Sequence, residues 1–326
     1  MGRMRVLELV VAEGPSGLRP STRDRPEVSS QGVVVRVSAV GINFPDLLAC
    51  RGMYQYKPPL PYVPGCEVAG VVEEVGPDSK FAVGDRVAMF VWEGGFAEWV
   101  SAPDRNVMIL PDSASMETGA GLIVNYHTVF FGLDVRGRLQ KGESVLVLGA
   151  GGGIGSAALQ VGRAMGARVV AGVTDETQER TARAAGADEV MFLEDGFSSE
   201  MQRLTAGRGF DMVLDPLGDR FFDEAIRGMA PGGRVLVVGF AAGQVPKIAV
   251  NRLLLRNISV VGVAWGAYLD VDPRIVASAG ARLSEMLEVD AIAPHIADRF
   301  QFGQIPVALE KLGRGEIRGK AVAILG

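Results

Sequence analysis

Two hydrophobic patterns divide the chain. Up to about residue 120, short apolar runs such as Gln31–Val40 and Val68–Val75 are separated by Gly, Pro and Asp turns, as at Gly84–Val87. Short runs of this kind predict half-buried strands. From Lys141 onward, strand-length β-branched runs alternate with helix-length segments. The pattern therefore predicts a compact, mainly β region followed by a region of alternating strands and helices.

The alternating region has the form of a parallel sheet. Near-continuous apolar strands separated by helices are typical of a sheet covered on both faces and wound by right-handed crossovers. The predicted fold class is α/β, a Rossmann-type doubly wound parallel sheet beside a mainly β domain. The expected strands are Val145–Leu148, Val169–Val173, Val190–Leu193, Met212–Leu214, Arg234–Val238 and Ile258–Val263, and the expected helices are Ile154–Met165, Glu176–Ala185, Ser198–Ala206, Asp219–Met229 and Ala249–Leu255.

A glycine cluster follows the first of these strands. The strand runs into Gly149 and Ala150, and small residues continue to Gly155, where a helix is expected. A dinucleotide-binding turn needs a tight bend, a backbone that can approach a pyrophosphate, and a last glycine that lets helix and strand pack closely. The residues predicted to bind a dinucleotide here are Ala150, Gly151, Gly152, Gly153, Ile154 and Gly155.

The end of the second strand bears on which nicotinamide nucleotide is bound. Asp175 lies some 20 residues beyond Gly155, where an acid favours the ribose 2′-hydroxyl of NAD. Arg180 favours the 2′-phosphate of NADP instead. Asp175 is also a plausible cap for the helix that follows. These residues alone leave the choice open.

Composition excludes other classes of function. The chain has 326 residues with 33 Lys and Arg against 38 Asp and Glu, and it has no basic run, which argues against nucleic-acid binding. Two Cys and two His cannot form the usual structural zinc site or a disulfide framework, and so few thiols suggest a reducing, cytoplasmic location. The uncharged stretch 144–162 contains six Gly with Ser and Gln, so we expect no membrane span.

Several motifs together resemble the zinc-independent quinone oxidoreductase branch of the medium-chain dehydrogenase/reductase superfamily. The resemblance covers nearly the whole chain. It is highly specific for the superfamily and less specific for the branch. The matching stretches are Gly41–Asp46 with Gly52–Tyr54, Pro61–Gly70, Gly84–Val87, the glycine cluster, Asp215–Gly218, and Asn251–Asn257 running to Trp265–Gly266.

This resemblance implies a domain plan, a reaction and an assembly. A GroES-like catalytic domain would comprise residues 1–123 and 290–326, around a dinucleotide-binding domain of residues 124–289, with the active site in the cleft between them. The reaction would pass a hydride from NADPH, with NADH as the alternative, to a quinone or another electron-poor enone. Members commonly dimerise through the edge strand of the dinucleotide sheet, here Ile258–Ala264, and an exposed apolar edge supplies a physical motive for pairing.

The resemblance also implies a site that holds no metal. Zinc-dependent relatives use a Cys where this chain has Asn43, and a His where it has Cys66. Cys66 and Glu67 are too few ligands for a zinc site, and Cys66 is better interpreted as a small buried hydrophobe. Without a Lewis acid, hydrogen-bond donors must steady the developing oxyanion, and Asn43 and Tyr54 are the candidates. Either could instead be structural, Asn43 as a turn cap and Tyr54 as a rim aromatic.

Further cofactor contacts follow from the same resemblance. It places Asn43 and Tyr54 beside the nicotinamide and the substrate, so Asn43 is also an expected cofactor-binding residue. Thr128 matches a position near the nicotinamide ring, whereas its neighbour His127 is expected to be a packed side chain. At two positions the chain differs from the family pattern. Gln178 replaces a Lys that binds the 2′-phosphate, leaving Thr174 or Arg180 to substitute, and Leu193 replaces a Tyr near the adenine. The remaining expected contacts, at the ends of the last two strands, are Gly239, Phe240, Ala264 and Trp265.

Two other functions remain open at this point. An enoyl-thioester reductase of the same superfamily would need basic residues for a phosphorylated carrier. A cofactor-binding protein without useful turnover would keep the glycine cluster and lack the reaction.

Overall fold

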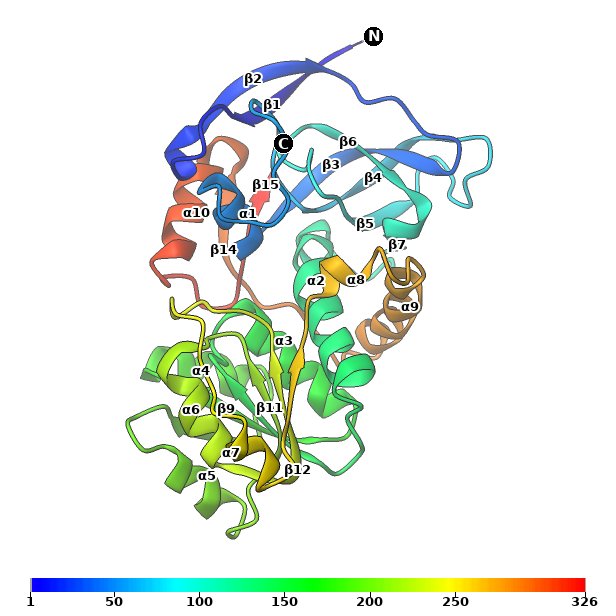
Figure 1. Ribbon diagram of the computed structural model, residues 1–326. Coiled ribbons are helices and arrows are strands. Elements are labelled where there is room, and N and C mark those ends of the chain that lie inside the picture. Colours follow the sequence, from blue (N-terminus) through cyan, green and yellow to red (C-terminus); the bar gives the residue numbers. More distant parts are fainter. Residues whose placement is uncertain (1, 326) are drawn as a thin grey trace. The chain divides into compact units, whose positions relative to one another are not determined.

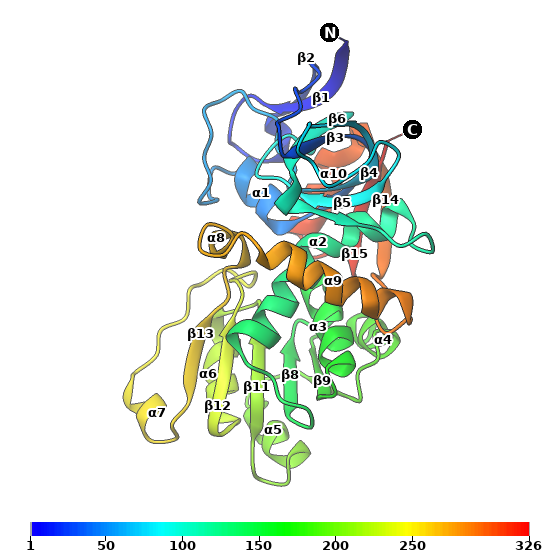
Figure 2. The same cartoon turned by 90° about the vertical axis from the view of Figure 1, so that its right-hand side faces the viewer.

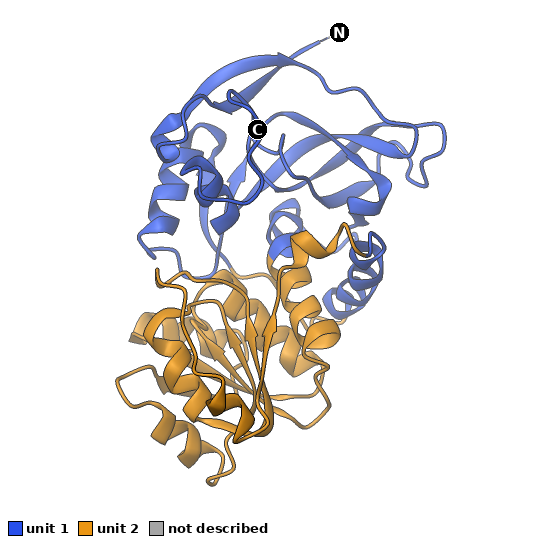
Figure 3. Cartoon of the chain, viewed as in Figure 1, with its two compact units in different colours: residues 1–124, 272–288, 296–326 blue, residues 125–271, 289–295 orange. Residues whose placement is uncertain are grey.

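The computed structural model describes residues 2–325, which divide into two compact units (Figure 3). Unit 1 comprises Met1–Val124, Asp272–Glu288 and Ile296–Gly326, and unit 2 comprises Asn125–Val271 and Val289–His295. The sequence interpretation had assigned 272–288 to the dinucleotide-binding domain. Here this segment contains helix α9 (Ile275–Glu288), which packs against β7 (Val107–Ile109) of unit 1. Among the described residues, no helix has the length and apolar content needed to cross a bilayer.

Unit 1 is built around a mixed seven-stranded sheet in which the order is β14-β15-β3-β4-β5-β7, with β6 also paired to β3 (Figure 1). The C-terminal strands β14 and β15 are therefore part of the N-terminal sheet, in agreement with the resemblance, which implied that residues 290–326 belong to the N-terminal domain. Val, Ala and Met side chains of these strands and Leu side chains of helices α1 and α10 form its core. Its elements are β1 (Arg3–Leu9), β2 (Leu18–Asp24), β3 (Gly32–Ile42), α1 (Phe44–Cys50), β4 (Glu67–Val75), β5 (Arg86–Phe90), β6 (Trp99–Pro103), β14 (Ile296–Gln301), α10 (Ile305–Gly313) and β15 (Lys320–Ile324), with short 3₁₀ turns at Pro15–Gly17, Asp104–Asn106 and Phe302–Gln304.

Unit 2 confirms the predicted doubly wound sheet. Its six strands are all parallel and lie in the order β10-β9-β8-β11-β12-β13, which is 3-2-1-4-5-6 in chain order, and Figure 2 shows most of them side by side. Helix α2 (Met116–Phe130) and a π-helical turn (Phe131–Arg136) lead into it. Its elements are β8 (Ser144–Leu148), α3 (Gly153–Ala164), β9 (Arg168–Val173), α4 (Glu176–Ala184), β10 (Glu189–Phe192), α5 (Ser198–Leu204), β11 (Phe210–Asp215), α6 (Asp219–Arg227), β12 (Met229–Val237), α7 (Asn251–Leu254), β13 (Ser259–Gly262) and α8 (Trp265–Tyr268).

One predicted helix is much shorter than expected. The apolar stretch Ala249–Leu255 forms only the single turn α7, and its residues Leu254 and Leu255 are 75% and 77% exposed. A helix is stabilised mainly by burying an apolar face, and this segment buries none of its residues. Leu253 packs partly against the core of unit 2, but Leu254 and Leu255 are left uncovered, so the longer bounds predicted for this helix are wrong.

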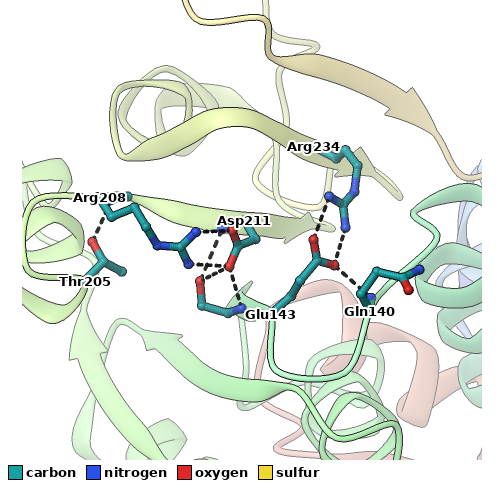
Figure 4. Close-up of polar contacts among 8 residues, drawn as sticks. Gln140, Glu143, Thr205, Arg208, Asp211 and Arg234 are labelled. Carbon is teal, nitrogen blue, oxygen red and sulfur yellow. Dashed lines mark hydrogen bonds and ion pairs between the residues drawn. The ribbon is translucent and has the colours of Figure 1, made fainter.

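Polar contacts tie together the amino ends of the strands of unit 2 (Figure 4). Arg208 pairs with Asp211 through two contacts of 2.6 Å, and the same carboxylate accepts from the backbone and hydroxyl of Ser144. Arg234 of β12 contacts Glu143, which precedes β8, at 3.0 and 2.6 Å. Burial raises the pKa of Asp211, but the hydrogen bonds from Arg208 and Ser144 outweigh it and lower that pKa to about 2. These ion pairs link neighbouring segments at the amino ends of the strands. The loops that follow the carboxyl ends lie at the opposite edge of the sheet.

Candidate functional site

The carboxyl ends of the six parallel strands of unit 2 meet at one edge of the sheet. In open α/β sheets this edge is where ligands bind. The loops leaving β8, β9, β12 and β13 lie there because of strand direction alone. They carry most of the predicted cofactor residues, namely Ala150, Gly151, Gly152, Gly153, Ile154, Gly155, Thr174, Asp175, Gly239, Phe240, Ala264 and Trp265.

The glycine turn at this edge contains glycines of two kinds. A Cβ on Gly155 would lie 2.3 Å from the carbonyl oxygen of Gly149 and 2.5 Å from Cα of Ala150, so this glycine lets α3 pack on the end of β8. A Cβ on Gly152 would meet only the oxygen of Gly149, at 3.5 Å. Gly152 also has an ordinary φ of −91° and is the N-cap of α3. Neither packing nor backbone conformation requires a glycine at position 152.

The first turn of α3 supplies donors beside that open space. The first N–H groups of a helix have no intrahelical acceptor and carry the positive end of the helix dipole. Gly152, Gly153 and Ile154 are half-buried, whereas Ala150, Gly151 and Gly155 are buried. Unpaired N–H groups at a helix start, beside space left open by a glycine, are the features that a diphosphate-binding turn needs.

The end of β9 is organised by Gln178. Its backbone N–H donates to Asp175 Oδ1 at 2.8 Å, which caps α4, and its amide donates to Thr174 Oγ1 at 2.8 Å and to Asp175 Oδ2 at 3.1 Å. Gln178 also lies against Gly151, where a Cβ would be 2.6 Å from its own Cβ. Arg180 is exposed and donates to Thr177 of its own helix. Asp175 is thus the helix cap anticipated as one alternative, and Thr174 and Arg180 present exposed polar groups.

The loops after β11 and β12 complete the edge on the other side of the glycine turn. Asp215 Oδ1 accepts from the backbone N–H groups of Leu217 and Gly218, both at 2.8 Å, and burial raises the pKa of this carboxyl. Leu217 in turn packs over Gly149. Gly239 resembles Gly152, because a Cβ there would meet only a carbonyl oxygen, at 3.5 Å, and Phe240 beside it is 40% exposed.

The segment that follows β13 packs against helix α2. His127 is fully buried and packs against Trp265 with ring centroids 5.5 Å apart, which agrees with the expectation of a packed histidine. Trp265 is itself only 4% exposed. Thr128 is half-buried and Ala264 is exposed, so these two residues present atoms at the surface of this region.

In unit 1, three neighbouring strands bring polar residues into one row. Ala321 of β15 pairs with Ile42 of β3, and Val40 of β3 pairs with Val68 of β4. This register places Lys320, Asn43 and Glu67 beside one another although Lys320 is 277 residues from Asn43. Lys320 Nζ lies 2.5 Å from Asn43 Oδ1 and 2.6 Å from Glu67 Oε2, and Asn43 Nδ2 donates to the same Glu67 oxygen at 3.0 Å.

Every member of this row is buried. Glu67 is 0% exposed, Asn43 3% and Lys320 4%. The other Glu67 oxygen accepts from the backbone N–H of Val124 at 2.9 Å. Sequence reasoning missed Lys320 and considered Glu67 only as a poor metal ligand. The only local signal is a lysine directly before the apolar run 321–325, which is too common to single out a residue.

Asp46 links this row to Cys66. Its Oδ2 accepts from the backbone N–H of Asn43 at 3.0 Å, which marks the start of α1, and its Oδ1 accepts from the N–H of Cys66 at 3.1 Å. Burial raises the pKa of Asp46 to about 7, although the contacts with Cys66, Lys320 and Asn43 oppose this. Burial also raises the pKa of the Cys66 thiol well above its usual range. Cys66 is therefore a buried, protonated thiol.

Tyr54 lies in the loop that follows α1 and is half-buried. Burial raises the pKa of its phenol to about 12, and the neighbouring Cys66 and Asp46 act in the same direction. The hydroxyl is therefore protonated at neutral pH and is able to donate a hydrogen bond.

The donor set around Asn43 does not suit a zinc ion. Within residues 2–325, no three His, Cys, Asp or Glu side chains are grouped so that they could hold a metal. The oxygens of Asn43 and Glu67 that a cation would use already face the ammonium of Lys320. A second positive charge in the same place would be strongly repelled.

Comparison with known proteins agrees with this architecture. Residues 29–112 match the alcohol dehydrogenase GroES-like domain, and residues 153–279 match the zinc-binding dehydrogenase family. The mouse quinone oxidoreductase-like protein 2 is 33% identical over 91% of this chain and 86% of its own, and the human quinone oxidoreductase is 30% identical over 99% and 98%. A mycobacterial protein solved with NADPH superposes with a TM-score of 0.91, at 27% identity over 99% of this chain and 100% of its own. Given this similarity over almost the whole chain, the protein is an enzyme that belongs to the quinone oxidoreductase family of the medium-chain dehydrogenase/reductase superfamily.

Proposed function

We propose that this enzyme transfers a hydride from NADPH to a quinone or a similar electron-poor enone, without a metal. The observation that carries the proposal is Gly152, a glycine at the mouth of the predicted dinucleotide turn that neither packing nor backbone conformation requires. Binding of a diphosphate would explain the glycine, because a backbone without a side chain can approach the diphosphate closely. The names of the mouse and human relatives support a quinone as acceptor.

The residues present fit the cofactor. NADPH supplies the hydride when it is bound. The backbone N–H groups of residues 153–155, in the first turn of α3, would hold its diphosphate, and Ala150 and Gly151 would lie beside it. The two open glycines, Gly152 and Gly239, would let the diphosphate lie close to the sheet edge. Thr128, Phe240, Ala264 and Trp265 are proposed to bind the nicotinamide half.

The 2′-phosphate is proposed to interact with Thr174 and Arg180. Both side chains are exposed at the end of β9 and the start of α4, and Arg180 is the cation. The Asp175 carboxylate accepts two hydrogen bonds from Gln178, which reduces its capacity to bind a ribose hydroxyl. We therefore propose NADPH over NADH as the preferred cofactor. Titration with each nucleotide tests this, and tighter binding of NADH would contradict it.

Two residues of unit 1 are proposed to steady the oxygen of the acceptor. Tyr54 holds its proton at neutral pH and can donate a hydrogen bond as negative charge develops on that oxygen. Asn43 would contribute an amide N–H. In this mechanism, solvent supplies the proton that completes the reduction.

Absorbance at 340 nm tests the activity. NADPH is mixed with the protein and 9,10-phenanthrenequinone, and in parallel with crotonyl-CoA. We expect oxidation of NADPH with the quinone. Turnover with crotonyl-CoA alone would replace the proposal with an enoyl-thioester reductase, and NADPH binding without turnover of either would indicate a cofactor-binding protein without this activity.

Asn43→Ala tests the role given to the amide. The variant should lower kcat by more than it raises the Kd for NADPH. An equal or reversed pattern would make Asn43 a residue for cofactor binding only.

A homodimer through the edge of the unit 2 sheet is a further part of the proposal. Strand β13 is the last strand of that sheet, and Val260 on it is 39% exposed. Leu254 and Leu255, just before it, are 75% and 77% exposed. Sedimentation analysis should give a dimer that Leu255→Lys weakens, whereas Val83→Lys, at a 64% exposed residue of unit 1, should not. A wild-type monomer at micromolar concentration would contradict the dimer.

A cytoplasmic location is also proposed. Cys50 and Cys66 are both free and buried, as expected for a protein that stays in a reducing compartment. Cell fractionation with antibody detection tests this location, and recovery from a secreted or membrane fraction would contradict it.

A further inference from the structure

Lys320 is a buried charge that the proposed reaction does not yet explain. Its ammonium contacts Glu67 and Asn43 at 2.6 and 2.5 Å, and the residue is 4% exposed. Removing an ammonium and a carboxylate from water costs about as much as their attraction returns, so apolar residues of similar size often give equal stability. Stability alone therefore does not explain why Lys320 and Glu67 are buried as an ion pair.

The charges on either side of Asn43 determine how its amide is oriented. Oδ1 accepts from the Lys320 ammonium, and Nδ2 donates to the Glu67 carboxylate. A flipped amide would place its oxygen against the carboxylate and its NH₂ group against the ammonium. Lys320 and Glu67 together thus permit one orientation. The positive charge at Oδ1 also polarises the amide, which strengthens its N–H groups as donors.

One of the two amide hydrogens is only weakly held. The bond from Nδ2 to Glu67 is 3.0 Å, whereas the second bond, to the carbonyl oxygen of Gly41, is 3.3 Å and longer than is usual for N–H···O. This second N–H is the one that can be given to a ligand oxygen at low cost.

Gly41 makes this arrangement possible. A Cβ at position 41 would lie 2.2 Å from Glu67 Oε2 and 2.2 Å from the carbonyl oxygen of Ala120. Only glycine allows the carboxylate to come this close to β3. The backbone of β3 is thus adapted to bring Glu67, and with it Lys320, against Asn43.

We propose that Lys320 is a positioning residue, which acts through Asn43 by fixing the orientation of its amide and strengthening the N–H that is held only by the long bond to Gly41. The effect on catalysis rests on the proposed function, in which that N–H steadies the acceptor oxygen.

A double-mutant cycle tests whether Lys320 acts through Asn43. Lys320→Met should lower kcat with the quinone by about tenfold or more, because the charged hydrogen bond from Lys320 to Asn43 is lost. It should leave the Kd for NADPH unchanged, because the glycine turn proposed to bind NADPH belongs to unit 2. In an Asn43→Ala background the same change should have no further effect on kcat. Lys320→Arg should retain most of the activity, and Lys141→Met, at an exposed lysine before β8, should behave as wild type. Additive losses at positions 320 and 43 would overturn the proposal.

Loss of the ammonium leaves the buried Glu67 carboxylate without a positive partner, so Lys320→Met is expected to lose stability as a single variant. The double variant Lys320→Met with Glu67→Gln removes both charges and carries the same test. It should regain stability without regaining kcat. Recovery of both would show that Lys320 only balances charge, and would overturn the proposal.

A second measurement needs neither cofactor nor acceptor. Side-chain amide NMR of the free protein, with Asn43 assigned through Asn43→Ala, reports on the amide directly. We expect Lys320→Met to shift the Asn43 amide resonances and speed their hydrogen exchange at least tenfold. Unchanged resonances and exchange would overturn the proposal. The expected change in a protein that reduces no quinone would support the positioning of Asn43 and contradict the proposed function alone.

Discussion

One methyl group placed at either of two glycines of the same turn should have opposite consequences. In Gly155→Ala the new Cβ would lie 2.3 Å from a backbone oxygen and 2.5 Å from a backbone carbon, and neither atom can move without separating α3 from β8. Overpacking of this kind costs about 1–3 kcal/mol in the free energy of unfolding. In Gly152→Ala the Cβ has one neighbour at 3.5 Å, an ordinary van der Waals distance. The cost there should stay within about 1 kcal/mol, because Ala is only a poorer N-cap than Gly.

Binding of NADPH should be affected in the opposite order, with Gly152→Ala weakening it more than Gly155→Ala. A methyl group at Gly152 would occupy the space proposed for the diphosphate. Losing one hydrogen bond to a charged group costs about 1.5–3 kcal/mol, which corresponds to a Kd raised roughly 10- to 150-fold. Gly155 is buried behind the turn, so folded Gly155→Ala protein should bind NADPH much more nearly as wild type does.

Two assays separate these effects. Isothermal titration gives the Kd for NADPH, and chemical denaturation gives the free energy of unfolding. Gly303→Ala is a matched control, because a Cβ there meets nothing within 4 Å and the residue belongs to unit 1. If Gly152→Ala binds NADPH with the wild-type Kd, the open glycine has no role in binding and the observation that carries the proposed function is lost.

Three further predictions concern charge. The pKa of Asp46 is raised to about 7 from 3.8, so the folded state binds more protons between these values. The contribution of Asp46 to the free energy of unfolding should therefore fall by about 3 kcal/mol as pH rises from 4 to 7. Asp46→Asn should lose this contribution to the slope in denaturation experiments, and equal slopes would contradict the pKa. Because the pKa of Tyr54 is about 12, its ionisation should not lower the reduction rate between pH 7 and 10, whereas Tyr54→Phe should lower kcat throughout; a pH–rate profile with a phenol-dependent fall in this range would refute this. Arg234→Met removes two contacts of 3.0 and 2.6 Å to Glu143 and should destabilise the protein by about 1–3 kcal/mol without changing the Kd for NADPH, since the pair lies at the amino ends of the strands; weaker NADPH binding would contradict that separation.

The sheet of unit 2 and its edge followed from local patterns. Strand-length and helix-length apolar periods predicted the alternation, and the observed strand order confirms the fold. Once the strands are parallel, the segments that follow them must meet at one edge, so the sequence positions of the glycine turn, Asp175 and Gly239 predicted where they lie. The short α7 was mispredicted because a period of apolar residues does not say whether another surface covers them.

The amino-acid sequence by itself determined the elements, their class and the glycine turn, because hydrophobic period, turn residues and bare backbone act over a few neighbouring residues. Only the tertiary structure decided the surroundings of Asn43. Its partners Glu67 and Lys320 are 24 and 277 residues away, and they meet through the pairing of β4, β3 and β15. No local pattern marks such a contact, since the register between distant strands is set by how the whole sheet buries its apolar face.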